Sequence, residues 1–287
     1  MLAKSQGRYE QAINIYKEII SNQPGVITAL KELGKIYQST ERGNDWVAYL
    51  KGYIKQNPDK VFAYNMLGRT YAIEKKWSEA REILEQALQV EPKSQETYGV
   101  LAAVQVQQGQ GKEAAETYRK GLIAFPDNPV LLMKLAKQHE RMQDFGKAIA
   151  IYDNLLKQYP DNVQIVNNLT YLLVETSDEE ADQKRALLLV ERLKDTDDPY
   201  LLDTYGWVLF KAGDVDGAIQ VMKKVVSVVP DKALFRYHLG EVYYAAGDHS
   251  ASKVELEKSL LLVEKSKGFP GIERARQLMK EINDSAA

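Results

Sequence analysis

The sequence contains no cysteine and only three histidines, His139, His238 and His249. The absence of cysteine excludes disulfide bonds, thiolate metal sites and cysteine nucleophiles. No two histidines stand at the spacing of metal ligands, so we expect neither a metal site nor a cofactor. The formal net charge is only -2, with 38 Lys and Arg against 40 Asp and Glu. Without a basic excess, the chain is not expected to bind nucleic acid, whose phosphates require cationic partners.

Long apolar runs are also missing. The longest, such as residues 186–190 and 260–263, are far shorter than the roughly 18 residues that a membrane-spanning helix requires. We therefore do not expect this segment to insert directly into a membrane. With 45% hydrophobic and 27% charged residues among 287, the composition is that of a soluble folded protein.

Proline is scarce, with nine residues in the chain, yet its positions are regular. Five of the nine stand 34 residues apart, at Pro24, Pro58, Pro92, Pro126 and Pro160. A fixed period of this size indicates stacked supersecondary units. If each proline is set third from the end of a unit, the units are 27–60, 61–94, 95–128, 129–162, 163–198, 199–232 and 233–266.

Within a unit, particular places carry residues suited to helix packing. The seventh place is large and the eighth is small in most units, as in Leu67 and Gly68. The twentieth place is small and the twenty-fourth is bulky, as in Ala80 and Leu84. A small residue lets a second helix approach, and a large residue fills the space beside it. Each unit is therefore predicted to be a helical hairpin.

The unit 61–94 shows the pattern most fully, through Tyr64, Leu67, Gly68, Tyr71, Ala80, Leu84, Ala87 and Pro92. These residues resemble the tetratricopeptide repeat family, and the resemblance covers nearly the whole chain. It implies an all-α fold, a right-handed α-solenoid superhelix of helix-turn-helix units. It also implies that the first helices of the units line a concave surface.

The two ends are expected to differ from the complete units. Residues 1–26 are predicted to be a partial repeat with the second helix only, because Ala12, Tyr16 and Pro24 fit the second-helix places and residues 7–10 fit the turn. Further repeats are expected upstream of this segment. Residues 267–287, with apolar residues at helical spacing from Ile272 to Ile282, are predicted to form a C-terminal capping helix. A helix that binds a partner is the alternative for that segment.

Some local features depart from the pattern or complete it. Trp46 occupies the small twentieth place of unit 27–60, so its second helix must pack differently, and Gln105 replaces the usual tyrosine in unit 95–128. We expect a looser core at both positions. Glycines predict turns at residues 109–111, 213–214 and 247–248. An aspartate that can cap the next helix follows four of the prolines, at Asp59, Asp127, Asp161 and Asp231.

The sequence offers no constellation typical of an enzyme. Residues 109–114 imitate a glycine-rich dinucleotide motif, but that motif requires a preceding strand, and a helix is expected there. The paired Glu179 and Glu180 lie in an inserted turn without an apolar pocket. We therefore predict no catalytic residue and no enzymatic activity.

Binding is the expected function. The inner-facing places of the last three first helices hold aromatic, amide and charged residues, which are Asn167, Asn168, Tyr171, Tyr200, Asp203, Thr204, Trp207, Tyr237, His238 and Glu241. Aromatic side chains in a groove anchor extended peptides or partner helices. We predict that a protein or peptide partner is captured there, with Trp207, Tyr171 and Tyr200 as anchors. Burial of some of these residues between neighbouring first helices is the alternative.

The segment 163–283 is also similar to the endings of large bacterial repeat lipoproteins, through residues 167–173, 202–208 and 237–241. Such proteins are associated with exopolysaccharide production, sorting of proteins to the envelope, or protease adaptor work. The similarity implies a scaffold in an envelope assembly or export system, periplasmic and held by a lipid anchor on an upstream segment. A self-associating assembly protein, a homo-oligomer, and a cytoplasmic chaperone-type adaptor are the alternatives.

Overall fold

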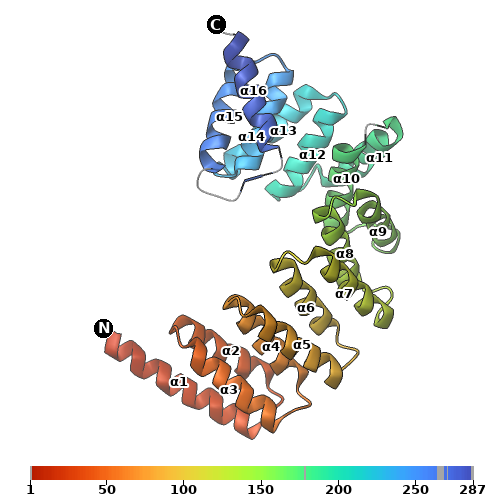
Figure 1. The fold of residues 1–287 in the computed structure, drawn as a ribbon. Helices are drawn as coiled ribbons and strands as arrows, with labels where there is room; N and C mark the ends of the chain where they lie inside the picture. The colour runs from red at the N-terminus through yellow and green to blue at the C-terminus, as the bar shows by residue number, and fades with distance from the viewer. Residues whose placement is uncertain (1, 178, 264–267, 270, 286–287) are drawn as a thin grey trace. The chain divides into compact units, whose positions relative to one another are not determined.

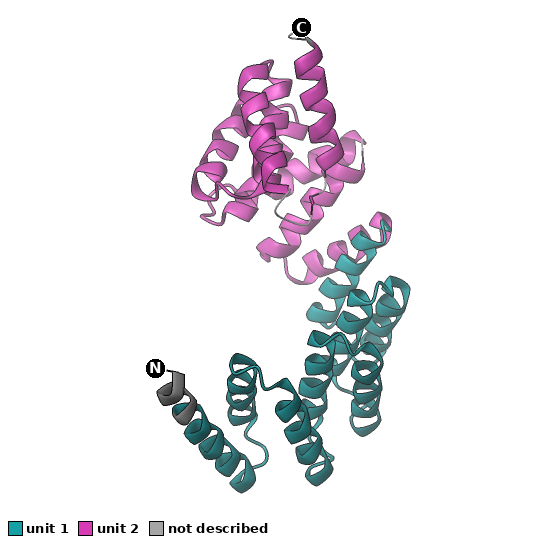
Figure 2. Cartoon of the chain, turned by 60° about the vertical axis from the view of Figure 1, so that its left-hand side comes forward, with its two compact units in different colours: residues 1–144 teal, residues 145–287 magenta. Residues whose placement is uncertain are grey.

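The computed structural model describes residues 2–177, 179–263, 268–269 and 271–285, with side chains described between residues 8 and 284 of these ranges. All regular structure in this part of the chain is helical (Figure 1). The chain divides into two compact units, residues 1–144 and residues 145–287 (Figure 2). The expected all-α fold is confirmed.

Unit 1 is built from α1 (Leu2–Asn22), α2 (Ile27–Ser39), α3 (Gly43–Gln56), α4 (Val61–Ile73), α5 (Trp77–Val90), α6 (Gln95–Gln107), α7 (Gly111–Ala124) and α8 (Pro129–Arg141). Each helix from α1 to α7 packs against the next one in the chain. In addition α4 packs against α6, and α6 against α8. The first helices of successive repeats therefore form a continuous row from α4 to α8.

Unit 2 is built from α9 (Phe145–Gln158), α10 (Val163–Thr176), α11 (Glu180–Val190) with the short 3-10 helix η1 (Glu191–Leu193), α12 (Pro199–Lys211), α13 (Val215–Val228), α14 (Ala233–Ala245), α15 (His249–Val263) and α16 (Ile272–Ser285). Neighbouring helices pack pairwise here as well. The row of first helices runs from α10 through α12 and α14 to α16.

Hairpin packing follows from the small and bulky places of the repeat. The small twentieth-place side chains from unit 61–94 onward are fully buried, with 0% exposure at Ala80, Ala114, Ala148, Ala218 and Ser252, and at Ala186, which is the equivalent residue of unit 163–198 once its inserted turn is allowed for. Their bulky neighbours one helical turn later are at most 4% exposed, at Leu84, Tyr118, Tyr152, Val190, Met222 and Leu256. This periodic burial forms the core between the two helices of a hairpin.

The repeat formed by residues 27–60 packs in a different way, as the tryptophan at its twentieth place indicated. Trp46 is buried and stacks between Tyr37 and Tyr49, with ring centroids 5.8 and 6.0 Å away. A Cβ atom on Gly34 would lie 2.9 Å from the Trp46 ring. The indole thus takes the position against the eighth-place glycine that the twenty-fourth-place residue holds in other hairpins. In unit 95–128, Gln105 accepts a hydrogen bond of 2.8 Å from the Thr117 hydroxyl across the hairpin.

Six of the turns inside the hairpins share one backbone conformation at the fifteenth place, and the exception is unit 163–198, where Ser177 is extended with φ of -135°. The expected turns at 109–111, 213–214 and 247–248 are confirmed, and Gly109, Gly213 and Gly247 have φ values of 78°, 92° and 79°. The same left-handed conformation occurs at the equivalent residues without glycine, which are Glu41, Lys75 and Gln143. Hairpins without the longer turn of unit 163–198 therefore take a left-handed residue here whatever its side chain.

Two local expectations are wrong. Residues 7–10 lie inside the continuous helix α1 rather than in a turn, because no proline interrupts this stretch and a single glycine inside a helix costs only about 1 kcal/mol. The aspartates after the prolines also do not cap the next helices. Asn128 and Asn162 cap α8 and α10 with their side-chain oxygens, and no side chain caps α4 or α14. At α8 and α10 the capping residue is the one directly before the helix, one position after Asp127 and Asp161, and at α4 and α14 a lysine without an acceptor oxygen takes that place.

Helix α16 closes the described end of unit 2. It packs against α14 and α15, and Ala275, Leu278 and Ile282 on it are buried. The opposite side carries exposed polar residues such as Glu273, Arg276 and Lys280. An amphipathic helix of this kind covers the apolar side of the last hairpin with a polar surface.

Candidate functional site

The residues expected to bind a partner lie on three neighbouring helices of unit 2. Helix α10 carries Asn167, Asn168 and Tyr171, helix α12 carries Tyr200, Asp203, Thr204 and Trp207, and helix α14 carries Tyr237, His238 and Glu241. Because α10 packs on α12 and α12 on α14, the structure brings these residues into one row of first helices. It does not leave all of them accessible.

Half of this set is buried, so the expectation that these side chains stand exposed in a groove is wrong for them. Exposure is 4% at Asp203, 5% at Thr204, 2% at Trp207, 5% at Tyr237 and 1% at His238. The physical reason is that neighbouring first helices pack on one another as well as on their own second helices. Their facing side chains therefore fill the space between the helices.

The centre of the buried group is a carboxylate–imidazole pair. The Nδ1 atom of His238 lies 3.0 and 2.9 Å from the two carboxylate oxygens of Asp203, so the ring donates a hydrogen bond to this carboxylate. The indole of Trp207 stacks on the His238 ring with centroids 4.1 Å apart and planes at 21°. The three side chains tie α12 firmly to α14.

Two charged residues, Glu175 and Lys211, contact the indole of Trp207. Its Nε1 atom donates a hydrogen bond of 2.7 Å to Glu175 on α10. Lys211 places its Nζ atom 5.0 Å from the centre of the Trp207 ring and 3.6 Å from the Glu175 carboxylate. A cation above an indole face and beside a carboxylate is held by both. Glu175, Trp207 and Lys211 thus join α10 to α12.

A second polar group joins α14 to α16. Burial and the neighbouring Glu241 carboxylate raise the pKa of Tyr237 far above its ordinary value, so this phenol stays neutral in the folded chain. Arg274 lies 3.5 Å from Glu241 and 3.6 Å from Glu281. Tyr244 donates a hydrogen bond of 2.8 Å to Glu281.

The accessible members of the expected set are fewer. Asn167, Asn168, Tyr171 and Glu241 are half-buried, and Tyr200 is 54% exposed. Asn167 donates from Nδ2 to the Asn168 Oδ1 atom at 3.4 Å, and its own Oδ1 is buried without a hydrogen-bond partner.

Tyr200 lies at the start of α12, away from the other accessible residues in the repeat pattern. It stacks edge-on against Phe235 at 5.2 Å, with Lys232 5.3 Å from its ring centre.

Sequence reasoning missed Glu175 and Lys211. Both stand at the thirteenth place of their units, on the inward side of the first helices. The place itself was the available signal, because the thirteenth place is one that core packing does not use. We define the unit 2 face as the accessible residues Asn167, Asn168, Tyr171, Glu175, Lys211 and Glu241.

The part of the chain that the structure describes offers few other groups that could bind a ligand or a metal ion. No group of His, Asp and Glu within it could hold a metal ion. The buried His139 lies with Nδ1 3.4 Å from Asp144 and with Nε2 3.5 Å from Arg119. None of the described helices combines the length and apolar character needed to cross a bilayer.

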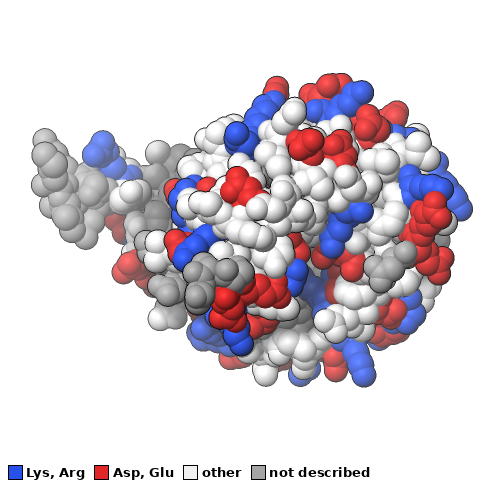
Figure 3. Space-filling view, turned by 90° about the horizontal axis from the view of Figure 1, so that it is seen from above, with Lys and Arg blue, Asp and Glu red and all other residues white. Residues whose placement is uncertain are grey.

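The charged side chains are mixed on the surface. On the face drawn in Figure 3, Lys and Arg stand among Asp and Glu, and no large area carries a single sign of charge. Long-range electrostatic attraction therefore does not single out one region of that face for a strongly charged ligand.

Comparison with known proteins agrees with the repeat pattern. A tetratricopeptide repeat model matches residues 71–137 and 209–264, and a second one matches residues 129–172. A tetratricopeptide repeat-containing protein of Pseudomonas aeruginosa is 28% identical over 87 residues. The match spans 30% of this chain and only 14% of the relative's own length.

Solved structures show the same fold at low sequence identity. A chain of the APC/C hetero-tetramer Cut9–Hcn1 has a TM-score of 0.64 at 16% identity, and the match covers 96% of this chain and 53% of that one. A tetratricopeptide repeat protein of Parabacteroides merdae has a TM-score of 0.62 at 16% identity, with 93% and 98% covered. The Pseudomonas aeruginosa pilF protein has a TM-score of 0.58 at 18% identity, with 78% and 97% covered.

Tetratricopeptide repeat proteins generally mediate protein–protein interactions, and the family typically provides non-catalytic scaffolds. The repeat models together match more than half of the sequence, and helical hairpins recur along the described residues. The chain belongs to the tetratricopeptide repeat family.

Proposed function

We propose that this chain is a non-catalytic interaction scaffold that binds a segment of a partner protein on the unit 2 face. One observation carries the proposal: accessible aromatic, amide and charged side chains remain on adjacent first helices above a fully packed layer. Tyr171, Glu175 and Lys211 form the centre of this face. Such a mixture suits a segment with both an apolar side chain and polar groups.

The layer below the face supports binding by being rigid. Trp207, His238 and Asp203 are held by stacking and hydrogen bonds, so the helices that carry the face are fixed before a partner arrives. Binding to a preorganised surface avoids the entropy cost of ordering it. The buried aromatic residues thus contribute as a foundation rather than as anchors.

The charges of the face favour a segment with no large net charge. Glu175 is paired with Lys211, and Glu241 with Arg274, so the side chains alternate in sign from α10 to α16. A partner segment with one basic and one acidic residue can form ion pairs with these side chains in place of the pairs within the chain, at little electrostatic cost. A strongly charged segment would leave part of the face unpaired.

The proposal can be tested by selecting displayed peptides on the folded chain and titrating the winners. We expect the combined change Tyr171→Ala and Lys211→Glu to weaken the selected peptides at least about tenfold, or about 1.4 kcal/mol. The control Leu188→Ala removes a side chain that is 77% exposed on α11 and should leave affinity unchanged. Circular dichroism verifies that each variant is folded. Selected peptides that bind both variants equally would show that the face is elsewhere.

A role in a bacterial envelope system is the finer proposal. It is supported by the likeness of segment 163–283 to repeat lipoproteins. Fractionation of cells that produce the natural full-length protein tests this location. Recovery in the periplasm with the membrane fraction agrees with a lipid-anchored protein, whereas recovery in the cytosol would favour a chaperone-type adaptor.

A further inference from the structure

A second candidate surface lies in unit 1, between the second helices α3 and α5. It is an open groove of about 360 Å³. Both helices pack on α4, which supplies the floor through Leu67 and Tyr71. Helices of the array stand on both sides of this groove along the chain, since α1 and α2 precede it and α6 to α8 follow it. The groove is separate from the unit 2 face, which lies on first helices.

The centre of the groove is apolar. Ile54 of α3 and Ile83 of α5 line it, and both are half-buried against the core that contains Leu67 and Tyr71. Leu67 and Tyr71 are only 1% and 6% exposed. An apolar side chain that enters here is removed from water by three helices. Because the floor belongs to the packed core, the groove is already formed when a ligand arrives.

The two rims of the groove carry opposite charges. Lys51 and Lys55 line it from α3 and form the lysine rim. Glu79 and Glu82 line it from α5 and form the glutamate rim. All four side chains are exposed. The neighbouring groove between α1 and α3 differs, because Lys17 is the one charged residue among the described residues that line it.

No ion pair joins the two rims within the described part of the chain. The Nζ atom of Lys51 lies 5.8 Å from the centre of the Tyr71 ring, which is a contact with the floor. Glu82 accepts a hydrogen bond of 3.4 Å from the glutamine one turn later on α5, and Glu79 interacts with Lys76 directly before α5. Each rim therefore keeps its charge on its own side of the groove, where a ligand can pair with it.

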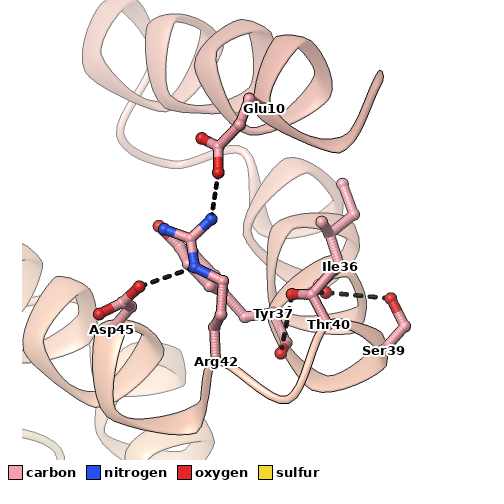
Figure 4. A network of polar contacts seen from close by, with 7 residues as sticks. All are labelled: Glu10, Ile36, Tyr37, Ser39, Thr40, Arg42 and Asp45. Atoms are coloured by element: carbon pink, nitrogen blue, oxygen red, sulfur yellow. Dashed lines mark hydrogen bonds and ion pairs between the residues drawn. The ribbon is translucent and has the colours of Figure 1, made fainter. Parts of the chain in front are cut away.

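Opposite charges on neighbouring second helices do pair elsewhere in the chain. Arg42, directly before α3, forms an ion pair with Glu10 of α1 and a second one of 2.7 Å with Asp45 of α3 (Figure 4). Arg185 of α11 donates a hydrogen bond of 3.3 Å to Asp153 of α9. Charge can thus tie two second helices together directly, whereas the described residues of α3 and α5 leave their charges apart.

The backbone of the walls determines the form of a matching ligand. Both walls and the floor are α-helices, whose N–H and C=O groups are bonded within each helix. An extended segment would therefore place unpaired backbone groups over the apolar floor, which is costly. A helix bonds its own backbone and packs its side-chain ridges between those of its neighbours. The groove is accordingly suited to a further helix laid along it.

We propose that the groove between α3 and α5 binds an amphipathic α-helix of a partner protein, with an apolar face, acidic residues on one flank and basic residues on the other. The apolar face enters over Ile54 and Ile83. The acidic flank lies against the lysine rim, and the basic flank lies against the glutamate rim. A helix with charges of only one sign leaves one rim unpaired and is repelled there.

The test uses three fluorescent helical peptides of 14 residues, the length of α3 and α5. They share one face of leucines, and a covalent staple on the outward side keeps them helical. One carries glutamate on one flank and lysine on the other, one carries glutamate on both flanks, and one carries lysine on both. We expect saturable binding of the mixed peptide in fluorescence anisotropy, with the two single-sign peptides at least about tenfold weaker.

A mixed peptide with its two flanks exchanged is not a control. Such a helix can lie along the groove in the opposite direction, and its acidic flank then meets the lysine rim as before. The peptides with a single sign of charge cannot avoid one repelling rim in either direction. The comparison therefore depends on the charges of the rims and not on the direction of the helix.

Charge reversal in the chain should switch the preference. With Lys51→Glu and Lys55→Glu both rims are acidic, so the peptide with lysine on both flanks should become the tightest of the three. The matched control is Lys223→Glu and Lys224→Glu, which changes the net charge equally at exposed positions of α13. It should leave the mixed peptide the tightest. Circular dichroism verifies that both variants are folded.

Four results would overturn the proposal. They are equal binding of the three peptides, no saturable binding of the mixed peptide up to about 1 mM chain, a preference that the reversal at Lys51 and Lys55 changes no more than the control does, and a chain that is dimeric without peptide and monomeric with that reversal. The last result would assign the groove to a second copy of the chain.

Discussion

At the scale of single residues, the hairpins depend on the absence of side chains at a few glycines. Gly68 is in contact distance of Leu84, and its added Cβ atom would meet three atoms of that side chain at 2.6–3.0 Å. Gly99 on α6 has nothing within 4 Å of such an atom. Two glycines inside first helices therefore have opposite roles, and the same substitution distinguishes them.

We expect Gly68→Ala to lower the free energy of unfolding by about 1–2 kcal/mol, since overpacking at a closed contact exceeds the gain in helix propensity. The control Gly99→Ala should raise it by about 0.5–1 kcal/mol, because only the helix propensity changes. Urea denaturation followed by circular dichroism measures both. Equal shifts in the two variants would contradict a close approach at Gly68.

The pair formed by Asp203 and His238 makes a second residue-scale prediction. Asp203→Ala leaves the buried Nδ1 donor of His238 without its acceptor, which costs about 1–3 kcal/mol of unfolding free energy. Glu257→Ala, at an exposed position of α15, is the control and should change stability by less than about 0.5 kcal/mol. If Asp203→Ala behaves like the control, the pair does not join α12 to α14.

The repeat places, and with them the helical hairpins and the small–bulky core, could be predicted from the sequence because each unit repeats the same local packing. The exposure of individual side chains on the first helices could not be predicted from the sequence. Tyr171 and Trp207 both occupy the ninth place of their units, yet Tyr171 is half-buried and Trp207 is 2% exposed. The difference comes from the next helix, where His238 offers a flat ring against which Trp207 stacks. The periodicity of the sequence does not tell which side chain of the next helix lies against a given residue.

At the scale of the structural element, the turn inside each hairpin sets the direction of its second helix. Six turns place a left-handed residue at the fifteenth place, and sequence inspection located only the three that contain glycine. Non-glycine residues tolerate this conformation at a cost, so composition alone hides the other turns. The spacing of the repeat contains the missing information.

Substitutions at the fifteenth place can therefore raise or lower the free energy of unfolding. Lys75, with φ of 58°, is strained, and we expect Lys75→Gly to raise the free energy of unfolding by about 0.5–1 kcal/mol after the entropy cost of glycine. Gly247→Ala, at φ of 79°, should lower it by about 1 kcal/mol. Denaturant titration of each variant measures the two shifts. Shifts of the same sign would contradict the requirement for a left-handed residue.

Helix α3 provides a prediction on pH. Burial, together with the nearby Tyr37 and Tyr53, raises the pKa of Tyr49 to about 12. Because the native state holds this proton more tightly than the unfolded state, stability should be complete below pH 10 and fall as the pH rises from 10 to 12. Tyr49→Phe should reduce this fall, and Tyr200→Phe at an exposed position should not. Thermal melts across this range test the expectation, and an identical fall in both variants would contradict it.

At the scale of the whole molecule, stability is distributed through contacts between neighbouring helices. Each helix packs only on nearby ones in sequence within its unit, so a chain of this kind behaves as a linear array in which a local change weakens the adjoining repeats first. Helix α16 is the described end of that array in unit 2. It covers α14 and α15 with Ala275, Leu278 and Ile282, while Phe269 before it lies 5.2 Å from the Tyr237 ring.

Removal of residues 268–287 should therefore open the end of unit 2. Burial of Leu278 and Ile282 contributes about 1.5–3 kcal/mol for each side chain, so we expect hydrogen exchange in α14 and α15 to accelerate strongly. Exchange in α4 and α5 should remain unchanged, because those helices belong to unit 1 and pack on α3 and α6. The combined surface change Arg276→Ala and Lys280→Ala keeps the apolar side of α16 and should leave exchange as it was. A uniform acceleration along the chain would show that the repeats unfold together, and the linear array would then be the wrong description of this molecule.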